Sequence, residues 1–504
     1  MNGSLTVHTS LSHPAVPSSQ YLEESLYALL DVQPVADPQS SGRPPLNLVL
    51  VIDASATMHH FHLSDEEEEY WLGVAISRDE LQRGEADEAE AVYWTGQTLL
   101  EMQSVARTAM AQAVDAIKTL LDALRPDDQI TLIAFADRVH TVFTRQDWAN
   151  FPDGCLTQLD LLSERRLPVD IGTGTHMAEA LRQAQTALSQ AQSGQKISRL
   201  IVISDGIVQD ADETIQTVEE VQSAGTAITT IGVGEEFDEE FLTRIADITR
   251  GEYHYAPVSA DIAERLTQEM ATLATTSVTD LYLAVRGLEG AVVQDIFMVR
   301  PSMTIFEEVH TEDGWLRTRV GDISSTAPAG IIVQFAPPIL PKGDHELLEA
   351  LLTWTGAGGN DRAVVSAAFT DNAAEWEQVN PAVQDLVDRF AVYRFEREAQ
   401  RAQQKGDLET AREKLGAATR QLHHLGEEAL AQEMEGQLAD LGTSRPGDGA
   451  RVKRIKATTR RLASPSPAPS QTAAPVKASV ETASVGTASV ETASVGTASV
   501  GTHD

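Results

Sequence analysis

Cysteine is almost absent from this chain of 504 residues, which has Cys155 as its single copy. One thiol excludes an intrachain disulfide, a redox pair and a zinc cluster built on cysteines. Long apolar runs are lacking too, since no stretch approaches the roughly eighteen uninterrupted apolar residues of a membrane span. Residues 1–10 have no basic region followed by an apolar core, which disfavours secretion. We therefore expect a cytoplasmic protein without a membrane span.

Positive charge is scarce, because 38 Lys and Arg residues face 75 Asp and Glu residues and the net charge is -37. Such a surface repels phosphate groups, which excludes nucleic acid and anionic membrane as general partners. Catalytic motifs are lacking as well: the sequence has no phosphate loop, no His-Glu-x-x-His and no Gly-x-Ser-x-Gly. We expect a protein that is not an enzyme and, from its length, one with several domains.

One apolar run, residues 46–52, ends in the motif Asp53-Ala-Ser55-Ala-Thr57. A strand that is apolar throughout is buried on both faces, which predicts a parallel sheet covered by helices. Ligands of such sheets bind beyond the carboxyl ends of the strands, where Asp53 stands. One carboxylate and two hydroxyls in a short loop are oxygen ligands that suit a hard divalent cation such as Mg²⁺. The motif therefore predicts one half of a metal site.

Two later segments supply candidate ligands for the other half. Thr175 follows the glycine-rich stretch 172–174 and opens a helical run, and Asp205 ends a second apolar strand in an Asp-Gly pair. Strands and helices alternate along this region, which is typical of a doubly wound sheet. Each residue also has an ordinary structural alternative. Aspartates are common in turns after strands, and Thr175 would be a normal helix N-cap.

In order and spacing, the three segments resemble the von Willebrand factor type A (VWA) domain over roughly residues 45–258. That family has the motif Asp-x-Ser-x-Ser, a threonine in a later loop, and an Asp-Gly pair that ends its fourth strand. The matching positions here are Asp53, Ser55, Thr57, Thr175 and Asp205. Thr57 stands where the family usually has serine, which keeps the hydroxyl ligand and adds a methyl group.

The resemblance implies a MIDAS-type site for Mg²⁺, with Mn²⁺ and Ca²⁺ as alternatives. In the family, the protein leaves one coordination position open, and an acidic residue of a partner protein fills it. We therefore expect a bacterial adaptor or scaffold that binds an Asp or Glu of a protein ligand. The alternative is a regulatory VWA subunit of an AAA+ ATPase or metal-chelatase-like complex, which copurification with such an ATPase would favour.

An acidic insertion, residues 59–100, follows the first motif directly and departs from the family pattern. Because it starts beside the metal loop, we expect it to control access to the site through its run of carboxylates, Glu66, Glu67, Glu68 and Glu69. The alternative is a solvated helical hairpin whose charges only keep the protein soluble. Three neighbouring histidines leave a transition-metal alternative open, at His59, His60 and His62.

The expected fold class is α/β, with a doubly wound, mostly parallel sheet of the VWA or Rossmann-like kind, joined to a β-sandwich, an α-helical hairpin and a disordered tail. The N-terminal strands in residues 1–44 complete the sandwich. The VWA domain occupies 45–258, and a linker helix with the rest of the sandwich occupies 259–380. A helical hairpin follows at 381–443, and the tail occupies 444–504.

The tail begins with a basic segment, residues 451–462, and ends in five copies of Ala-Ser-Val-(Glu or Gly)-Thr. Thr458 and Thr459 lie among basic residues, as in sites of basophilic Ser/Thr kinases, and a phosphothreonine-reading domain could then bind there. The alternative is that the basic segment docks on the acidic body of its own chain. We expect the repeats to act as a spacer.

Overall fold

A computed structural model describes most of the chain, in these ranges: residues 5–18, 22, 24–35, 45–59, 65–86, 89–94, 97–98, 107–190, 196–234, 237–306, 309–355, 359–441 and 449–463. Within these ranges, the side chains of 65–69, 81–86, 89–94 and 449–450 are not described. The predicted repeat spacer therefore lies outside the described residues. No helix in the described ranges is both long and apolar enough to cross a membrane.

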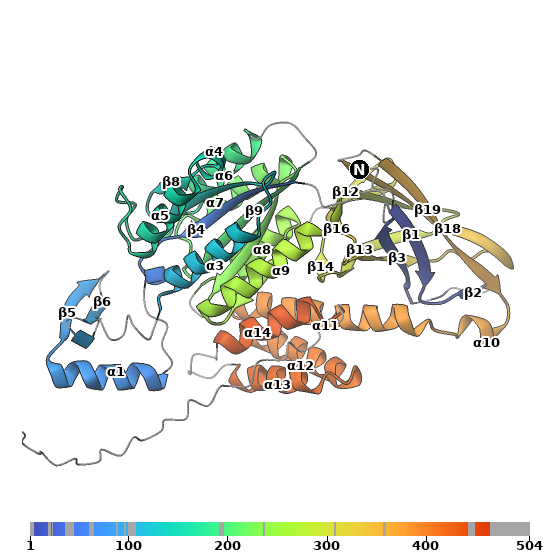
Figure 1. Ribbon diagram of the computed structural model, residues 1–504. Helices are drawn as coiled ribbons and strands as arrows, with labels where there is room; N and C mark the ends of the chain where they lie inside the picture. Colours follow the sequence, from blue (N-terminus) through green and yellow to red (C-terminus); the bar gives the residue numbers. More distant parts are fainter. Residues whose placement is uncertain are drawn as a thin grey trace, which may run out of the picture. The chain divides into compact units, whose positions relative to one another are not determined.

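A six-stranded sheet forms the centre of the α/β domain (Figure 1). Its order is β11 (Tyr253–Ala256), β10 (Ala227–Val233), β9 (Ile197–Ser204), β4 (Leu46–Asp53), β7 (Gln129–Phe135) and β8 (Val139–Phe143). All neighbouring pairs are parallel except β7 with β8. The chain leaves β4 toward β7 and later returns to β9 on the other side, so the strand order reverses at β4. The predicted α/β class is confirmed.

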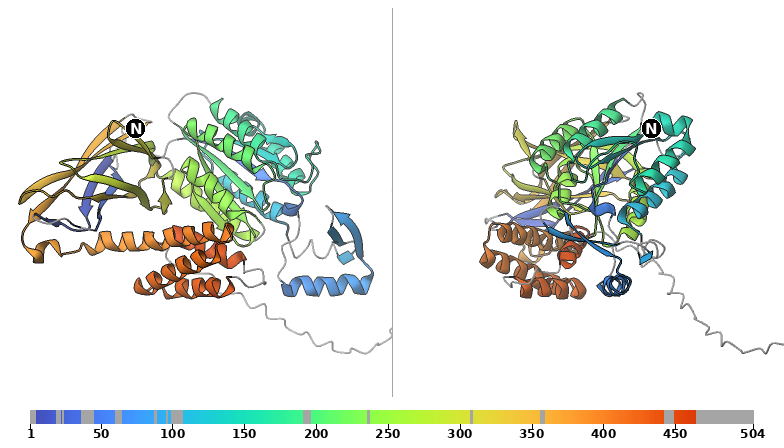
Figure 2. Two further views of the ribbon diagram at one scale, coloured as in Figure 1. Left: turned by 180° about the vertical axis from the view of Figure 1, so that it is seen from behind. Right: turned by 90° about the vertical axis from the view of Figure 1, so that its left-hand side faces the viewer.

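Helices cover both faces of this sheet (Figure 2). Side chains alternate along β4, so that Leu48 and Leu50 join the core under one helical layer while Val49 and Val51 join the other. The first layer contains α3 (Ala109–Ala123), α5 (Pro152–Ser163) and α9 (Ile262–Ala274), and the second contains α6 (Ala178–Ser189), α7 (Ala211–Ser223) and α8 (Glu239–Thr249). Short helices complete the domain, namely η1 (Thr57–His59), α4 (Arg145–Asn150) and η2 (Ser259–Asp261).

The α/β domain extends beyond the predicted boundary at residue 258. Helix α9 was expected to be a linker, but Ile262, Leu266 and Leu273 are buried in the core of the α/β domain. The prediction was wrong because the sequence shows that this helix has an apolar face but not which domain buries that face. Tertiary packing decides this.

Two further sheets form the β-sandwich, and the N-terminal strands belong to both. One sheet contains β1 (Leu5–Leu11), β3 (Leu26–Pro34), β17 (Ala329–Ala336), β13 (Val292–Arg300) and β14 (Thr304–Ile305). The other contains β15 (His310–Glu312), β16 (Trp315–Ser324), β12 (Thr276–Gly287), β18 (Gly343–Thr355), β19 (Gly359–Thr370) and β2 (Ala15–Pro17). The α/β domain is therefore inserted between strands of one sandwich.

The acidic insertion contains helix α1 (Asp65–Arg78) and an antiparallel hairpin of β5 (Leu81–Ala86) and β6 (Ala89–Trp94). Glu80 is anchored by the backbone amides of Gln97 and Thr98, at 2.9 and 2.7 Å. The expected helical hairpin is thus a helix followed by a strand pair. The side chains of Glu66 to Glu69 are outside the described set, so the proposed control of access stays a prediction.

The helical domain is larger than the predicted hairpin. It contains α11 (Pro381–Gln404), α12 (Leu408–His424), α13 (Glu428–Asp440) and α14 (Gly449–Arg460), after the single turn α10 (Ala373–Trp376). The expectation of a disordered segment from 444 onward is wrong for residues 449–460. Ile455 of α14 is fully buried in the core of this domain, and α11 packs on the sandwich through Phe390, whose ring stacks on Phe297 at 3.8 Å.

Three basic side chains of α14 are buried, namely Lys453, Lys456 and Arg460. Arg460 Nη1 lies 2.6 Å from Asp247 Oδ1, and Lys456 Nζ lies 4.0 Å from Glu239 Oε2. Burial is the main cause that raises the pKa of Glu239 to about 8, although Lys456 opposes it. The docking of this basic segment on acidic residues of its own chain, one of the two sequence alternatives, is the arrangement that the structure has.

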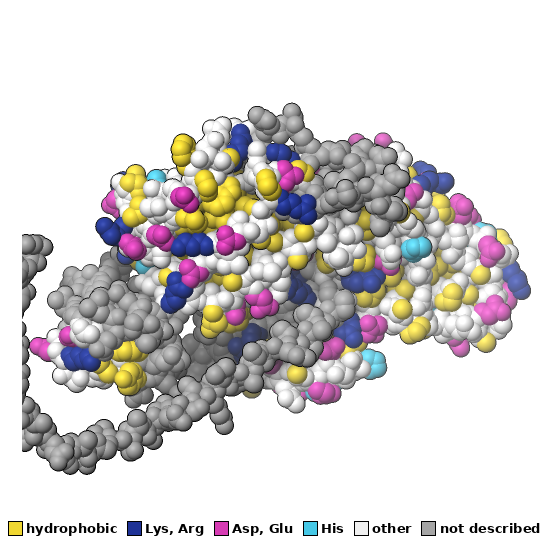
Figure 3. Space-filling view, in the orientation of Figure 1, with side chains coloured by type: hydrophobic (Ala, Val, Ile, Leu, Met, Phe, Trp, Pro, Cys, Tyr) yellow, Lys and Arg dark blue, Asp and Glu magenta, His cyan; other side chains and the backbone are white. Residues whose placement is uncertain are grey.

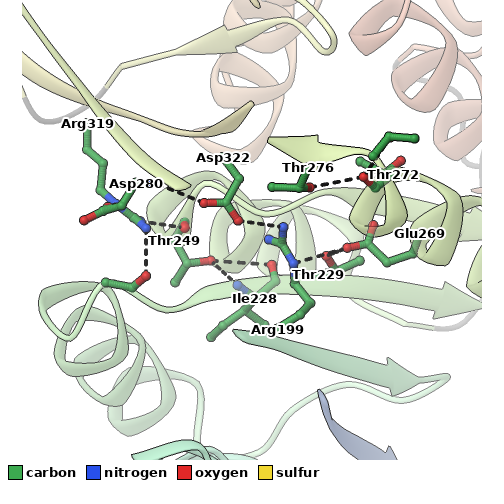
Figure 4. A network of polar contacts seen from close by, with 12 residues as sticks. Arg199, Ile228, Thr229, Thr249, Glu269, Thr272, Thr276, Asp280, Arg319 and Asp322 are labelled. Atoms are coloured by element: carbon green, nitrogen blue, oxygen red, sulfur yellow. Dashed lines mark hydrogen bonds and ion pairs between the residues drawn. The ribbon is translucent and has the colours of Figure 1, made fainter. Parts of the chain in front are cut away.

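A buried polar network joins the α/β domain to the sandwich (Figure 4). Arg199, near the start of β9, lies 3.0 Å from Asp322 of β16 and 3.3 Å from Glu269 of α9. Arg319 of β16 pairs with Asp280 of β12 and donates to two carbonyls of the α/β domain. Since Arg199 is near the amino end of β9, this junction lies at the opposite end of the strand from the candidate site.

Candidate functional site

The loop after β4 presents its three predicted ligands in one cluster. Asp53 Oδ1 accepts a hydrogen bond from the Ser55 amide at 2.9 Å, which turns the chain back over the end of the strand. The hydroxyls of Ser55 and Thr57 lie 3.0 Å apart. This turn follows from the sequence, because aspartate side chains readily accept a bond from the amide two residues ahead.

The two later segments meet this loop. Thr57 Oγ1 donates to Asp205 Oδ1 at 2.8 Å, across 148 positions of sequence. A Cβ placed on Gly206 would lie 3.1 Å from Thr175 Oγ1 and 3.4 Å from Asp53 Oδ2, so these two oxygens flank one small space. The structure therefore brings all five predicted ligands to the carboxyl edge of the sheet.

Asp53 is a fully buried carboxylate, with an exposed fraction of 0%. Its hydrogen-bond partners, the Ser204 hydroxyl at 2.6 Å and the Ser55 amide, are neutral. Burial raises the pKa of Asp53, and these hydrogen bonds oppose the rise only in part. A buried carboxylate whose hydrogen-bond donors are neutral is stabilised when it takes up a proton or binds a cation.

The prediction that Thr175 is an N-cap, made as the structural alternative, is wrong. Helix α6 begins at Ala178 without a side-chain cap from its own N-cap residue, Met177. Asp210 performs this task, since its carboxylate accepts from the Met177 and Ala178 amides at 2.9 and 3.0 Å. Thr175 therefore does not cap α6, and its hydroxyl lies near Asp53 at the candidate site.

Supporting residues were missed in the sequence. Asp137 accepts hydrogen bonds from the Thr173 and Gly174 amides at 3.0 and 3.2 Å and so shapes the loop that carries Thr175. Gln209 Oε1 accepts from the Thr175 amide at 3.2 Å. Asp137 follows the apolar strand β7, so the rule that found Asp53 could have found it. No comparable sequence pattern indicated a role for Gln209.

The donor set fits a hard divalent cation. Carboxylates of Asp53 and Asp205, with hydroxyls of Ser55, Thr57 and Thr175, are oxygen ligands of the kind that Mg²⁺ binds together with water. Thiolate and imidazole, which softer metals prefer, are missing from these five residues. Among the described residues, no group of three or more His, Cys, Asp and Glu side chains could hold a metal ion. The transition-metal alternative has no support there, although His60 and His62 lie outside the described ranges.

The two threonines named as phosphorylation candidates differ in their surroundings. Thr459 is fully buried in α14, and its hydroxyl donates to the Lys456 carbonyl at 3.0 Å. Thr458 is exposed on the same helix. Of the two, a kinase could reach Thr458 alone without unfolding α14, so the prediction of phosphorylation narrows to this residue.

Gly172→Ala is expected to destabilise the protein by roughly 1–3 kcal/mol and to weaken metal binding, because φ at Gly172 is +86° and a Cβ would lie 1.9 Å from Asp137 Oδ2. Urea unfolding and Mg²⁺ calorimetry would measure both effects. Gly154→Ala is the matched control, since Gly154 is helical and its Cβ would meet Phe151 at an ordinary 3.8 Å. Equal stability of both alanine variants would contradict the positioning role of the 172–174 loop.

Comparison with known proteins identifies two parts of the chain. Residues 103–269 match the von Willebrand factor type A domain, and residues 381–465 match the Sll0103-like, C-terminal alpha-helical domain. Inter-alpha-trypsin inhibitor heavy chain H2 of Mus musculus is 28% identical over 157 residues, which are 28% of this chain and 15% of that protein. The heavy chain H2 of Sus scrofa is 28% identical over 156 residues. The match thus spans 15% and 16% of the lengths of these two relatives.

A solved structure shares the fold over nearly the whole chain. It is the von Willebrand factor type A protein from Catenulispora acidiphila, with a TM-score of 0.65, 16% identity and coverage of 90% of this chain and 96% of that one. The α/β domain is therefore a VWA domain, of the class that commonly mediates interactions between proteins. The chain therefore contains a VWA domain together with additional strand-rich and C-terminal helical regions.

Proposed function

We propose that this chain is an adaptor whose VWA domain binds a partner protein through a divalent cation. Mg²⁺ is the physiological ion in this proposal, and Mn²⁺ or Ca²⁺ can replace it. The chain holds the ion through Asp53, Ser55, Thr57, Thr175 and Asp205. An Asp or Glu side chain of the partner supplies a further oxygen ligand.

The observation that carries this proposal is the contact between Thr57 and Asp205 at 2.8 Å. It joins the loop ends of two neighbouring parallel strands, β4 and β9, at the edge where ligands of such sheets bind. The five side chains offer oxygen atoms and contain neither an imidazole nor a thiol. An oxygen-lined site of this kind suits the binding of a hard cation and an acidic ligand, and we propose no catalytic activity for it.

The first test is calorimetric titration of Mg²⁺ into the full chain, with Asp205→Asn as the variant. The wild type is expected to bind saturably and Asp205→Asn to lose this binding, since the amide removes one charged oxygen ligand. Any protein ligand should then dissociate in EDTA and rebind when Mg²⁺ is restored.

Asp128→Asn is the matched control for this titration. Asp128 is also buried, but it lies at the other edge of the sheet, where its carboxylate accepts from the Leu46 and Arg125 amides, each at 2.8 Å. This variant should lose stability and still bind Mg²⁺. Undiminished Mg²⁺ binding by Asp205→Asn would show that the ion binds elsewhere.

A further inference from the structure

A cavity of about 240 Å³ opens beside the candidate metal site. Ala54, in the loop after β4, and His59, at the start of the acidic insertion, line one side of it. Residues between 162 and 173, in the segment that leads to Thr175, line the other side. These two walls are joined directly, because the Ala56 amide donates to the Thr173 carbonyl at 3.1 Å. The cavity is therefore a fixed neighbour of the site, attached to the same loop.

The walls of this cavity are partly aliphatic and partly polar. Five of the ten lining residues are aliphatic, and Asp170 adds a carboxylate whose Oδ1 accepts a hydrogen bond from the Gly172 amide at 3.0 Å. Leu162 and Ile171 are buried beneath it, Leu167 is half-buried, and Val169 is 49% exposed at its rim. Ile207, which follows the Asp205-Gly206 pair, is 65% exposed. Val169 and Ile207 therefore leave aliphatic surface exposed near the candidate site.

One cation lines the same cavity. Arg165 is exposed at the end of α5, and its guanidinium makes no hydrogen bond or ion pair to the part of the chain that the structure describes. In contrast, the next residue, Arg166, pairs with Glu164 at 3.2 Å. The whole chain carries a net charge of -37, and the face in Figure 3 mixes acidic and basic side chains with hydrophobic ones. Asp170 lines the cavity as well, and its Oδ1 is already bonded to the Gly172 amide. An exposed guanidinium next to a partly aliphatic cavity and a candidate cation site can pair with an acidic ligand that has an apolar neighbour.

We infer that the cavity is a second subsite for the same protein ligand. It takes a bulky apolar side chain that neighbours the ligand's metal-binding Asp or Glu, and Arg165 pairs with a second acidic residue. The inference rests on the proposed function and names the chemistry of the partner. Pockets for small-molecule ligands usually enclose about 300–1,000 Å³, so a cavity of about 240 Å³ suits a side chain better than a free metabolite.

The test uses a phage-displayed library of random peptides, selected on the full chain in Mg²⁺ and eluted with EDTA. The selected peptides are expected to share an acidic residue with a bulky aliphatic or aromatic residue close by in sequence. Val169→Asp should weaken their binding about tenfold or more, because it places a charge at the rim of the apolar subsite. Arg165→Glu should weaken those peptides that carry a second acidic residue. Both variants should bind Mg²⁺ like the wild type.

Val258→Asp is the matched control, because Val258 is 56% exposed in the same domain and does not line the cavity. It should leave peptide binding unchanged. Peptides that need Mg²⁺ and Asp205 but bind Val169→Asp normally would overturn the subsite and leave the proposed metal function standing. A chain that binds Mg²⁺ but selects no EDTA-sensitive peptide would also overturn the subsite. Selected peptides that bind Asp205→Asn normally but fail to bind Val169→Asp would contradict the proposed function instead.

Discussion

Asp53→Asn is expected to abolish Mg²⁺ binding and, at the same time, to raise the free energy of unfolding of the metal-free protein by up to about 2 kcal/mol. The carboxylate is fully buried and its partners are neutral, so its ionisation costs free energy in the folded state. An amide has the same shape, can accept from the Ser55 amide, and can donate to the Ser204 hydroxyl. Calorimetry and urea unfolding in EDTA would measure the two effects.

The pH dependence gives this prediction a second check. Because burial raises the pKa of Asp53 above its unfolded value, the folded metal-free chain holds the proton more tightly than the unfolded chain. The cost of ionisation is therefore present above the folded pKa and disappears below the unfolded value. The advantage of asparagine should shrink as the pH falls through this window. Asp128→Asn should instead be less stable than the wild type at neutral pH, and a loss of stability in Asp53→Asn as well would refute the functional reading of Asp53.

Arg460→Met is expected to lower the free energy of unfolding of the helical domain by about 3–5 kcal/mol, because it breaks a buried ion pair. Arg460 is 3% exposed and lies 2.6 Å from Asp247, which would lose this partner in the variant. Denaturant unfolding would measure the loss. Limited trypsin digestion should then cut within 451–461 in the variant and spare this segment in the wild type.

Arg454→Met is the control for Arg460→Met. It removes the same charge from the same helix, at an exposed position. Its effect should stay within about 1 kcal/mol, because interactions of an exposed charged side chain contribute little to stability. Similar stability and similar digestion of the two variants would mean that the inward face of α14 does not hold the segment in place.

The core of the VWA domain could be predicted because its signals are local. The strand 46–52 is apolar at every position but Asn47, and such a run is buried on both faces wherever it lies. Asp53 and Asp205 follow strands of this kind, so their positions at one edge follow from parallel pairing alone. Asp137 follows β7 in the same way. It was not among the predicted ligands, and its role in shaping the 172–174 loop depends on contacts with backbone amides of that loop, which the sequence does not show.

The C-terminal helix could not be predicted in this way. By composition, residues 451–462 are a solvated basic segment, yet Lys453, Lys456 and Arg460 are buried. Their partners, Phe237, Glu239 and Asp247, precede them by more than 200 positions, as with the 216 positions between Lys453 and Phe237. A local sequence pattern cannot show which residues so far away in the chain will be the partners of these side chains. Helix α9 was wrongly predicted to be a linker for a related reason. Its apolar residues predict an amphipathic helix, but they do not show which domain covers its apolar face.

By itself, the sequence determined the doubly wound sheet, the order of the three site segments and the identity of the five candidate ligands. The sheet and the positions of Asp53 and Asp205 follow from apolar periodicity and from polar residues at strand ends, which are properties of short stretches. The full set of five, including Thr175, follows from the resemblance of the sequence to the VWA family. Only the tertiary structure decided that Thr57 touches Asp205, that Asp210 and not Thr175 caps α6, and that a cavity with Arg165 adjoins the site. It also decided that the basic segment is part of the folded body. Those features depend on contacts between distant positions, whose free energies exist only once the chain has packed.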